Sequence, residues 1–170
     1  MSILSRLFPA RASRQPYIPL YNAVVREARQ RFWYAEGGAP DTLDGRFDMV
    51  AAVMALVLIR MEAEGQAGLE PAARLTELFV DDMDGQLRQQ GVGDIVVGKH
   101  VGRMMSALGG RITAYREGLA GGDMEAALIR NLWRGEAPAG GAGIVAAGMR
   151  ALADRLAART LPELLEGRLS

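Results

Sequence analysis

Few residues of this sequence could carry out catalysis. The chain of 170 residues has one histidine, His100, and no cysteine. A catalytic triad needs a nucleophile next to a base, and no serine lies in a nucleophile-elbow sequence. The absence of cysteine also excludes thiolate metal sites and disulfides. The sequence therefore predicts a protein that is not an enzyme.

An acidic cluster, Asp81, Asp82 and Asp84, could contact a divalent cation. Its spacing lacks the staggered oxygens and the terminal glutamate of a calcium loop. The string GVGD at 91–94 has the glycines of a phosphate-binding loop, but it follows a predicted helix and has no lysine at the required position. A solvated or partner-binding helix face and a capped turn explain these features better. We therefore expect no metal and no cofactor.

Methionine is frequent, with nine in the chain. Most of them fall on apolar helix faces, which is typical of core positions. Methionine also repacks easily, and proteins that accept varied hydrophobic segments use it often. A methionine-lined groove that opens to a partner is therefore the alternative to a purely internal role.

The element that organises the chain is a predicted helix at about 44–62. Eleven consecutive apolar residues, 49–59, lie within it. At 1.5 Å per residue this run covers about 17 Å, little more than half of the ~30 Å hydrocarbon core of a bilayer. A helix that is apolar on all sides needs neighbours on all sides. We predict an all-α fold, a single bundle of about six helices around this buried central helix.

Apolar spacing and terminal glycines or prolines predict the other helices. One runs from about 19 to 35, Pro71 suits the first turn of another with an acidic outer face, and a short helix carries residues 124–133. A helix at about 95–119 has glycines that suggest close helix contact or a bend, at Gly98, Gly102, Gly109 and Gly110. We expect a basic tail (1–18), a helical domain (19–134), a glycine-rich linker (135–143) and a C-terminal amphipathic helix (144–170).

The N-terminal tail is basic although the chain as a whole is neutral. Residues 1–31 hold six arginines and one acidic residue, whereas the chain balances 20 basic against 20 acidic residues. The neutral total does not favour nucleic-acid binding. The tail could rest on an anionic membrane surface, act as an organelle-targeting peptide, or be a frayed terminus.

Three strings, DTLDGRFDM (41–49), FVDDMDGQLRQQGVGD (79–94) and RNLW (130–133), resemble the ubiquinol–cytochrome c chaperone family over about 20–135. The resemblance implies an all-α protein that assists assembly of the cytochrome bc1 complex. The family-motif residues are Tyr21, Asp41, Thr42, Gly45, Arg46, Phe47, Asp48, Asp82, Met83, Asp84, Leu87, Arg88, Gly91, Gly93, Asp94, Lys99, Gly110 and Arg111. The chain departs from the pattern at Val53, usually histidine, at Gln89, usually acidic, and at Gly109, often aromatic.

The resemblance implies a membrane-protein client, cytochrome b, and leaves a second assembly subunit open. It places a bacterial member in the cytoplasm at the inner membrane, and a eukaryotic one on the matrix side. Acidic rims suit the basic cytoplasm-side loops of a client. We therefore expect one recognition surface, formed by Asp81, Asp82, Asp84, Arg88, Asp94 and Lys99.

A helical carrier of quinone, lipid or haem is the alternative function. It requires a contiguous enclosed apolar cavity between the central helix and its methionine-bearing neighbours. A packed interior with an open groove favours the chaperone instead.

Overall fold

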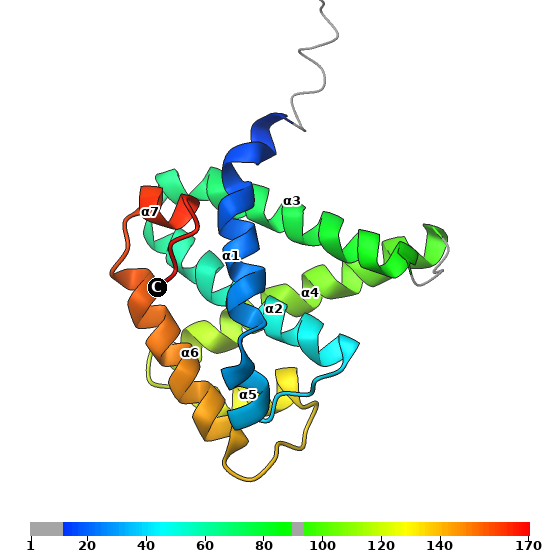
Figure 1. The fold of residues 1–170 in the computed structure, drawn as a ribbon, viewed down its shortest axis with the longest axis vertical. Coiled ribbons are helices and arrows are strands. Elements are labelled where there is room, and N and C mark those ends of the chain that lie inside the picture. Colours follow the sequence, from blue (N-terminus) through cyan, green and yellow to red (C-terminus); the bar gives the residue numbers. More distant parts are fainter. Residues whose placement is uncertain (1–11, 90–93) are drawn as a thin grey trace, which may run out of the picture.

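The computed structural model describes residues 12–89 and 94–170. The described residues form helices and no strand (Figure 1), which confirms the all-α prediction. A 3-10 turn, η2 (Ala12–Tyr17), precedes α1, and a π-helical segment, η3 (Phe32–Glu36), follows it. The α-helices are α1 (Ile18–Ala28), α2 (Leu43–Ala63), α3 (Gln66–Gln89), α4 (Asp94–Leu119), α5 (Met124–Leu132), α6 (Gly141–Ala157) and α7 (Leu161–Leu165).

Helix α2 is the buried centre of the bundle, as predicted. Every residue from Met49 to Leu58 is at most 6% exposed. Helices α1, α3, α4, α5 and α6 all contact α2, so its apolar surface is covered from several sides. Burial of each large apolar side chain contributes about 1.5–3 kcal/mol, which makes α2 the main source of stability. In the part of the chain that the structure describes, no helix is long and apolar enough to cross a membrane.

The predicted helix 19–35 is wrong in its second half. Helix α1 ends at Ala28 because side chains occupy carbonyls that a continuing helix would use. The Trp33 indole N–H donates to the Glu27 carbonyl (2.8 Å), and the Tyr34 hydroxyl donates to the Ala28 carbonyl (2.8 Å). The chain turns and resumes as η3, which places Trp33 in the core at 2% exposure.

Helix α3 begins five residues before Pro71, earlier than predicted. Its first turn lies against the end of α2, where a Cβ on Gly68 would be 1.8 Å from the Met61 carbonyl oxygen. Figure 1 shows that the C-terminal part of α3 and the N-terminal part of α4 extend beyond the other helices.

The glycines of α4 do not make the close contacts expected of them. A Cβ added at Gly98, Gly102, Gly109 or Gly110 would have no atom of the described chain within 4 Å. The outer surface of this helix is therefore bare backbone over several turns.

The C-terminal residues form two helices, α6 and α7, where the sequence predicted one. Helix α6 begins at Gly141, inside the predicted linker, and buries Val145, Met149 and Leu152 at 0% exposure. The Arg60 guanidinium of α2 donates to the carbonyls of Leu156 (3.1 Å) and Arg159 (2.9 Å). The end of the chain is therefore part of the same core as the central helix.

Candidate functional site

The predicted acidic face of α3 is partly occupied by contacts within the chain. The Tyr21 hydroxyl donates to one carboxylate oxygen of Asp82 (2.7 Å), and the Gln86 amide donates to the other (3.1 Å). Burial, together with this hydrogen bond, raises the pKa of Tyr21 above its usual value. Asp82 therefore joins α1 to α3, and each of its carboxylate oxygens already accepts one hydrogen bond within the chain.

Asp81 and Asp84 lie nearer to solvent. Asp81, whose side chain is 64% exposed, pairs with Arg14, and the Arg14 Nε is also 3.5 Å from Glu77. The Nε of Arg88 donates to the Asp84 carboxylate at 2.7 Å. A basic residue of the predicted tail thus neutralises part of the acidic face.

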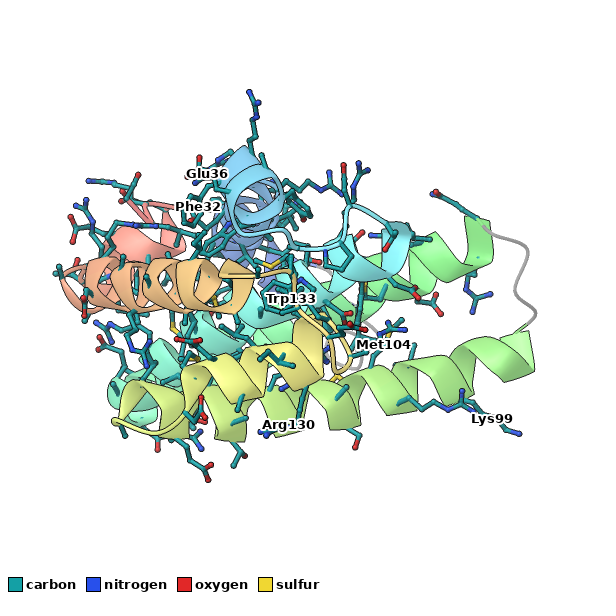
Figure 2. The ribbon with its side chains drawn as sticks, turned by 90° about the horizontal axis from the view of Figure 1, so that it is seen from below. Phe32, Glu36, Lys99, Met104, Arg130 and Trp133 are labelled. Carbon is teal, nitrogen blue, oxygen red and sulfur yellow. The ribbon has the colours of Figure 1, made fainter. Side chains whose placement is uncertain are left out.

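No hydrogen bond or ion pair within the described ranges joins Lys99, another predicted partner-binding residue, to the aspartates of α3. Lys99 is exposed on the projecting part of α4 (Figure 2). Asp94 is the first residue of α4, and its side chain, like that of Leu87, lies outside what the structure describes. Gly91 and Gly93 also lie outside the described residues. The single surface predicted from Asp81 to Lys99 therefore stays a prediction.

The first family motif builds the N-terminus of α2. The Thr42 hydroxyl accepts a hydrogen bond from the Gly45 N–H (3.1 Å), which is an N-cap. A Cβ on Gly45 would lie 2.0 Å from the Pro40 carbonyl oxygen, so no other residue fits there. Arg46 and Asp41 form an exposed ion pair at 2.7 Å. These residues fix the first turn of α2, and this turn determines where the side chains of Phe47 and Asp48 lie.

Asp48 and Arg111 form a buried ion pair between α2 and α4. The Arg111 guanidinium is 2.5 Å from one Asp48 oxygen and donates to the Asn131 carbonyl at 3.0 Å, so it also fixes α5. Burial raises the pKa of Asp48, while Arg111 and then Arg134 lower it. Burial raises the pKa of neighbouring Tyr115 to about 12, and Arg111 opposes that rise.

Three adjoining hollows surround Arg134, and together we call them the groove. An apolar hollow of about 190 Å³ is lined by Leu43, Asp44, Phe47, Met83, Gln86, Met104 and Arg134. A second, of about 180 Å³, lies between the start of α2 and the end of α5. A basic hollow of about 280 Å³ is lined by Phe47, Asp48, Arg103, Met104, Ala107, Arg111, Arg130, Asn131 and Arg134. Figure 2 shows Met104 on α4 and Trp133 at the end of α5 on either side of this region.

The groove floor combines aromatic and methionine side chains. The rings of Phe47 and Phe79 are 5.8 Å apart between centroids, which anchors Phe47 on α3. Met83 is 3% exposed and Met104 is half-buried, so each presents an edge to the groove. Leu43, at the entrance, is 55% exposed. Met49, Met54 and Met61 are instead fully buried in the core, as expected for core positions, and a methionine-lined groove that opens to a partner stays a prediction.

Arg134 has an unusual backbone conformation. Its φ of +57° makes it the one non-glycine residue in the described ranges with a left-handed conformation. Such residues cost roughly 1–3 kcal/mol and are concentrated at functional sites. The Arg134 guanidinium lies 3.5 Å from both Asp44 and Asp48 and is 64% exposed. This backbone turn directs the chain away from α5 while Arg134 borders all three hollows.

Arg103, Arg130 and Arg134 were not among the residues that the sequence analysis selected. The only available signal was the string RNLW at 130–133, which the resemblance included without assigning it a role. Arg103 lies 27 residues before Arg130 and 31 before Arg134, and these residues cannot be grouped without knowing how α4 packs on α5.

The ubiquinol-cytochrome C chaperone family model matches residues 35–170, which is most of the chain. The chain belongs to this family. The match includes α6 and α7, and so extends beyond residue 135, where the resemblance noted in the sequence ended. Membership supports a role in assembly of the cytochrome bc1 complex.

A solved structure supports the same relationship. The crystal structure of the Cbp3 homolog from Brucella abortus aligns with a TM-score of 0.80 and 29% identity, covering 99% of this chain and 96% of that one. No curated protein sequence matches the chain significantly. Within the described residues, no group of three or more histidine or acidic side chains could hold a metal ion. The groove offers a ubiquinol-cytochrome C chaperone an apolar floor and a charged rim, which suit binding.

Proposed function

We propose that the protein is an assembly chaperone that holds an immature respiratory membrane subunit, cytochrome b of the bc1 complex, in the groove. The observation that carries this proposal is an open apolar floor, formed by Leu43, Phe47, Met83 and Met104, in a chain of this family. Helices of an unassembled membrane protein expose apolar surface that aggregates readily. A groove of this kind can cover such a helix until its own partners arrive.

The charged surfaces next to the groove support the same function. Asp81 and Asp84 lie on α3, the helix that contributes Met83 to the groove floor. Carboxylates at that position suit the basic cytoplasm-side loops of a membrane client. We place the chaperone at the cytoplasmic face of the inner membrane, with the basic tail (1–18) as a candidate contact for anionic lipid.

A carrier of quinone, lipid or haem is less well supported by the geometry. The apolar hollow, at about 190 Å³, is smaller than the 300–1,000 Å³ typical of small-molecule sites. A hollow of about 450 Å³ is lined by Arg29, Arg31, Tyr34, Asp41 and Arg46, which is a polar lining. The methionines of α2 itself, Met49, Met54 and Met61, are packed in the core.

Two leucines of similar exposure provide a matched test. Leu43 borders the groove and is 55% exposed, whereas Leu69 is 59% exposed near the start of α3 and lines none of the three hollows. A photoreactive phenylalanine analogue would replace each in turn in the native host. We expect cytochrome b to be crosslinked at position 43 and not at position 69, as identified by mass spectrometry of the membrane fraction. Equal crosslinking at both positions, or none at either, would contradict the assignment of cytochrome b as the client of the groove.

A further inference from the structure

The basic hollow at the end of the groove has an excess of positive charge. Four arginines line it, Arg103, Arg111, Arg130 and Arg134, against a single carboxylate, Asp48. They come from α4, from α5 and from the residues directly after α5. Figure 2 shows Arg130 on α5, which runs alongside α4.

The charges in this hollow are compensated unequally. Arg111 is paired with Asp48 at 2.5 Å, so this buried pair is close to neutral. The Arg134 guanidinium is paired more weakly, because it comes no closer than 3.5 Å to the carboxylates of Asp44 and Asp48. Arg103 and Arg130 are exposed and make no ion pair with any residue in the described ranges. The hollow therefore has two to three guanidinium groups available for an anion.

Part of the wall of this hollow is apolar. Phe47, Met104 and Ala107 line the basic hollow, and Phe47 and Met104 also line the apolar hollow next to it. A small inorganic anion would gain nothing from this wall. A segment with both an acidic and an apolar side chain would use both parts of the groove.

We propose that the basic hollow binds a carboxylate on an apolar peptide segment, so that the partner segment has a Glu or Asp next to the apolar residues that fill the groove. Guanidinium forks pair with carboxylates through two parallel hydrogen bonds, which fixes the orientation of the segment. This inference rests on the proposed function and specifies the chemistry of the segment that is held.

The test compares two fluorescein-labelled synthetic peptides, each 16 residues long and rich in leucine and alanine. They differ only in a central pair of residues, Glu-Glu in one and Gln-Gln in the other. Binding to the full-length protein is measured by fluorescence anisotropy at low and high salt. We expect the Glu peptide to bind about five- to tenfold more tightly at low salt, and this preference to shrink at high salt, where exposed charge pairs are screened.

The variant Arg103→Gln/Arg130→Gln keeps Arg134, so it should lose most, but not all, of the preference for the Glu peptide. The control Arg26→Gln/Arg31→Gln removes the same charge from two exposed arginines outside the groove and should keep the preference. Circular dichroism checks that both variants are folded.

Several results would overturn the inference. These are equal affinity of the two peptides for the native protein, no binding of either, or a preference of undiminished size in Arg103→Gln/Arg130→Gln. Arginine-dependent binding to phosphatidylglycerol vesicles without peptide preference would assign the hollow to lipid headgroups instead.

If position 43 crosslinks to cytochrome b but the peptides bind equally, only this inference fails. If the peptides are distinguished but no crosslink forms, only the client assignment fails.

Discussion

At the scale of single residues, Arg134 combines backbone strain with a position at the centre of the groove. Glycine adopts a positive φ without the Cβ penalty of about 1–2 kcal/mol that other residues incur. The long ion pairs of Arg134 with Asp44 and Asp48 recover only part of this energy, because exposed pairs are worth about 0–1 kcal/mol. The guanidinium is therefore held at this position at some cost in stability.

Two substitutions separate the backbone strain at position 134 from the ion pairs of the Arg134 guanidinium. Arg134→Gly and Arg134→Ala both remove the guanidinium, but only the glycine variant removes the strain. We expect Arg134→Gly to be more stable than Arg134→Ala by about 1 kcal/mol in urea unfolding. Equal stability of the two variants would contradict the strain at this position.

The buried pair Asp48–Arg111 gives a second residue-scale prediction. Arg111→Met leaves the Asp48 carboxylate without its main partner at 4% exposure, which should cost about 3–5 kcal/mol. Asp48→Leu combined with Arg111→Met removes both charges and should cost less than Arg111→Met alone. Urea unfolding of the single and double variants measures this. A double variant no more stable than Arg111→Met would show that packing, not charge, dominates at this pair.

At the scale of elements, two helical glycines have opposite environments. The Cβ of an alanine at position 68 would lie 1.8 Å from the Met61 carbonyl oxygen, so Gly68→Ala should push α3 away from α2. At Gly102 nothing lies within 4 Å, so Gly102→Ala should stabilise α4 by up to about 1 kcal/mol. Thermal unfolding should therefore give a lower Tm for the first variant and a higher Tm for the second. A rise in Tm for Gly68→Ala would contradict the close contact.

The start of α7 gives a prediction about pH. The Thr160 backbone N–H and hydroxyl donate to the Glu163 carboxylate at 2.9 and 2.8 Å, and these bonds lower the pKa of Glu163 from its usual 4.5. A lowered pKa in the folded state means that the carboxylate stabilises the fold above the unfolded-state pKa, and that this contribution is lost as the pH falls through the folded-state pKa.

Glu163→Gln keeps the shape of this side chain and cannot ionise. The Tm difference between the native protein and Glu163→Gln should therefore be largest near neutral pH and should shrink below about pH 4.5. Thermal melts of both proteins across this range provide the measurement. A difference that stays constant with pH would mean that the ionised form has no special role in this cap.

At the scale of the whole molecule, the C-terminal residues complete the core. Leu164 and Leu169 are at most 5% exposed, and the Arg159 carbonyl accepts a hydrogen bond from Arg60. Removal of residues 158–170 should lower the Tm clearly, since each buried leucine contributes about 1.5–3 kcal/mol. The single variant Leu164→Ala provides the graded comparison and should lower the Tm less. An unchanged Tm after truncation would mean that this segment does not pack in solution.

The sequence predicted the fold better than the site, for a physical reason. Apolar periodicity is a local property, so the central helix at 44–62 and its sheathing helices could be read from residue order. The break after Ala28 could not, because it depends on Trp33 and Tyr34 reaching back to specific carbonyls. Nor could the groove, since Phe47, Met104 and Arg134 come from three separate segments. Asp82 was selected for its charge, and its hydrogen bond with Tyr21 required the packing of α1 on α3.

The hydrogen bond from Arg60 to Leu156 joins residues 96 positions apart. During synthesis at about 5–20 residues per second, the apolar helix that carries Arg60 leaves the ribosome roughly 5–20 s before α6 can cover it. For that interval the side of α2 that α6 covers in the folded protein stays exposed on the nascent chain. A protein that we propose to shield another newly made chain thus needs shelter while it is itself being translated.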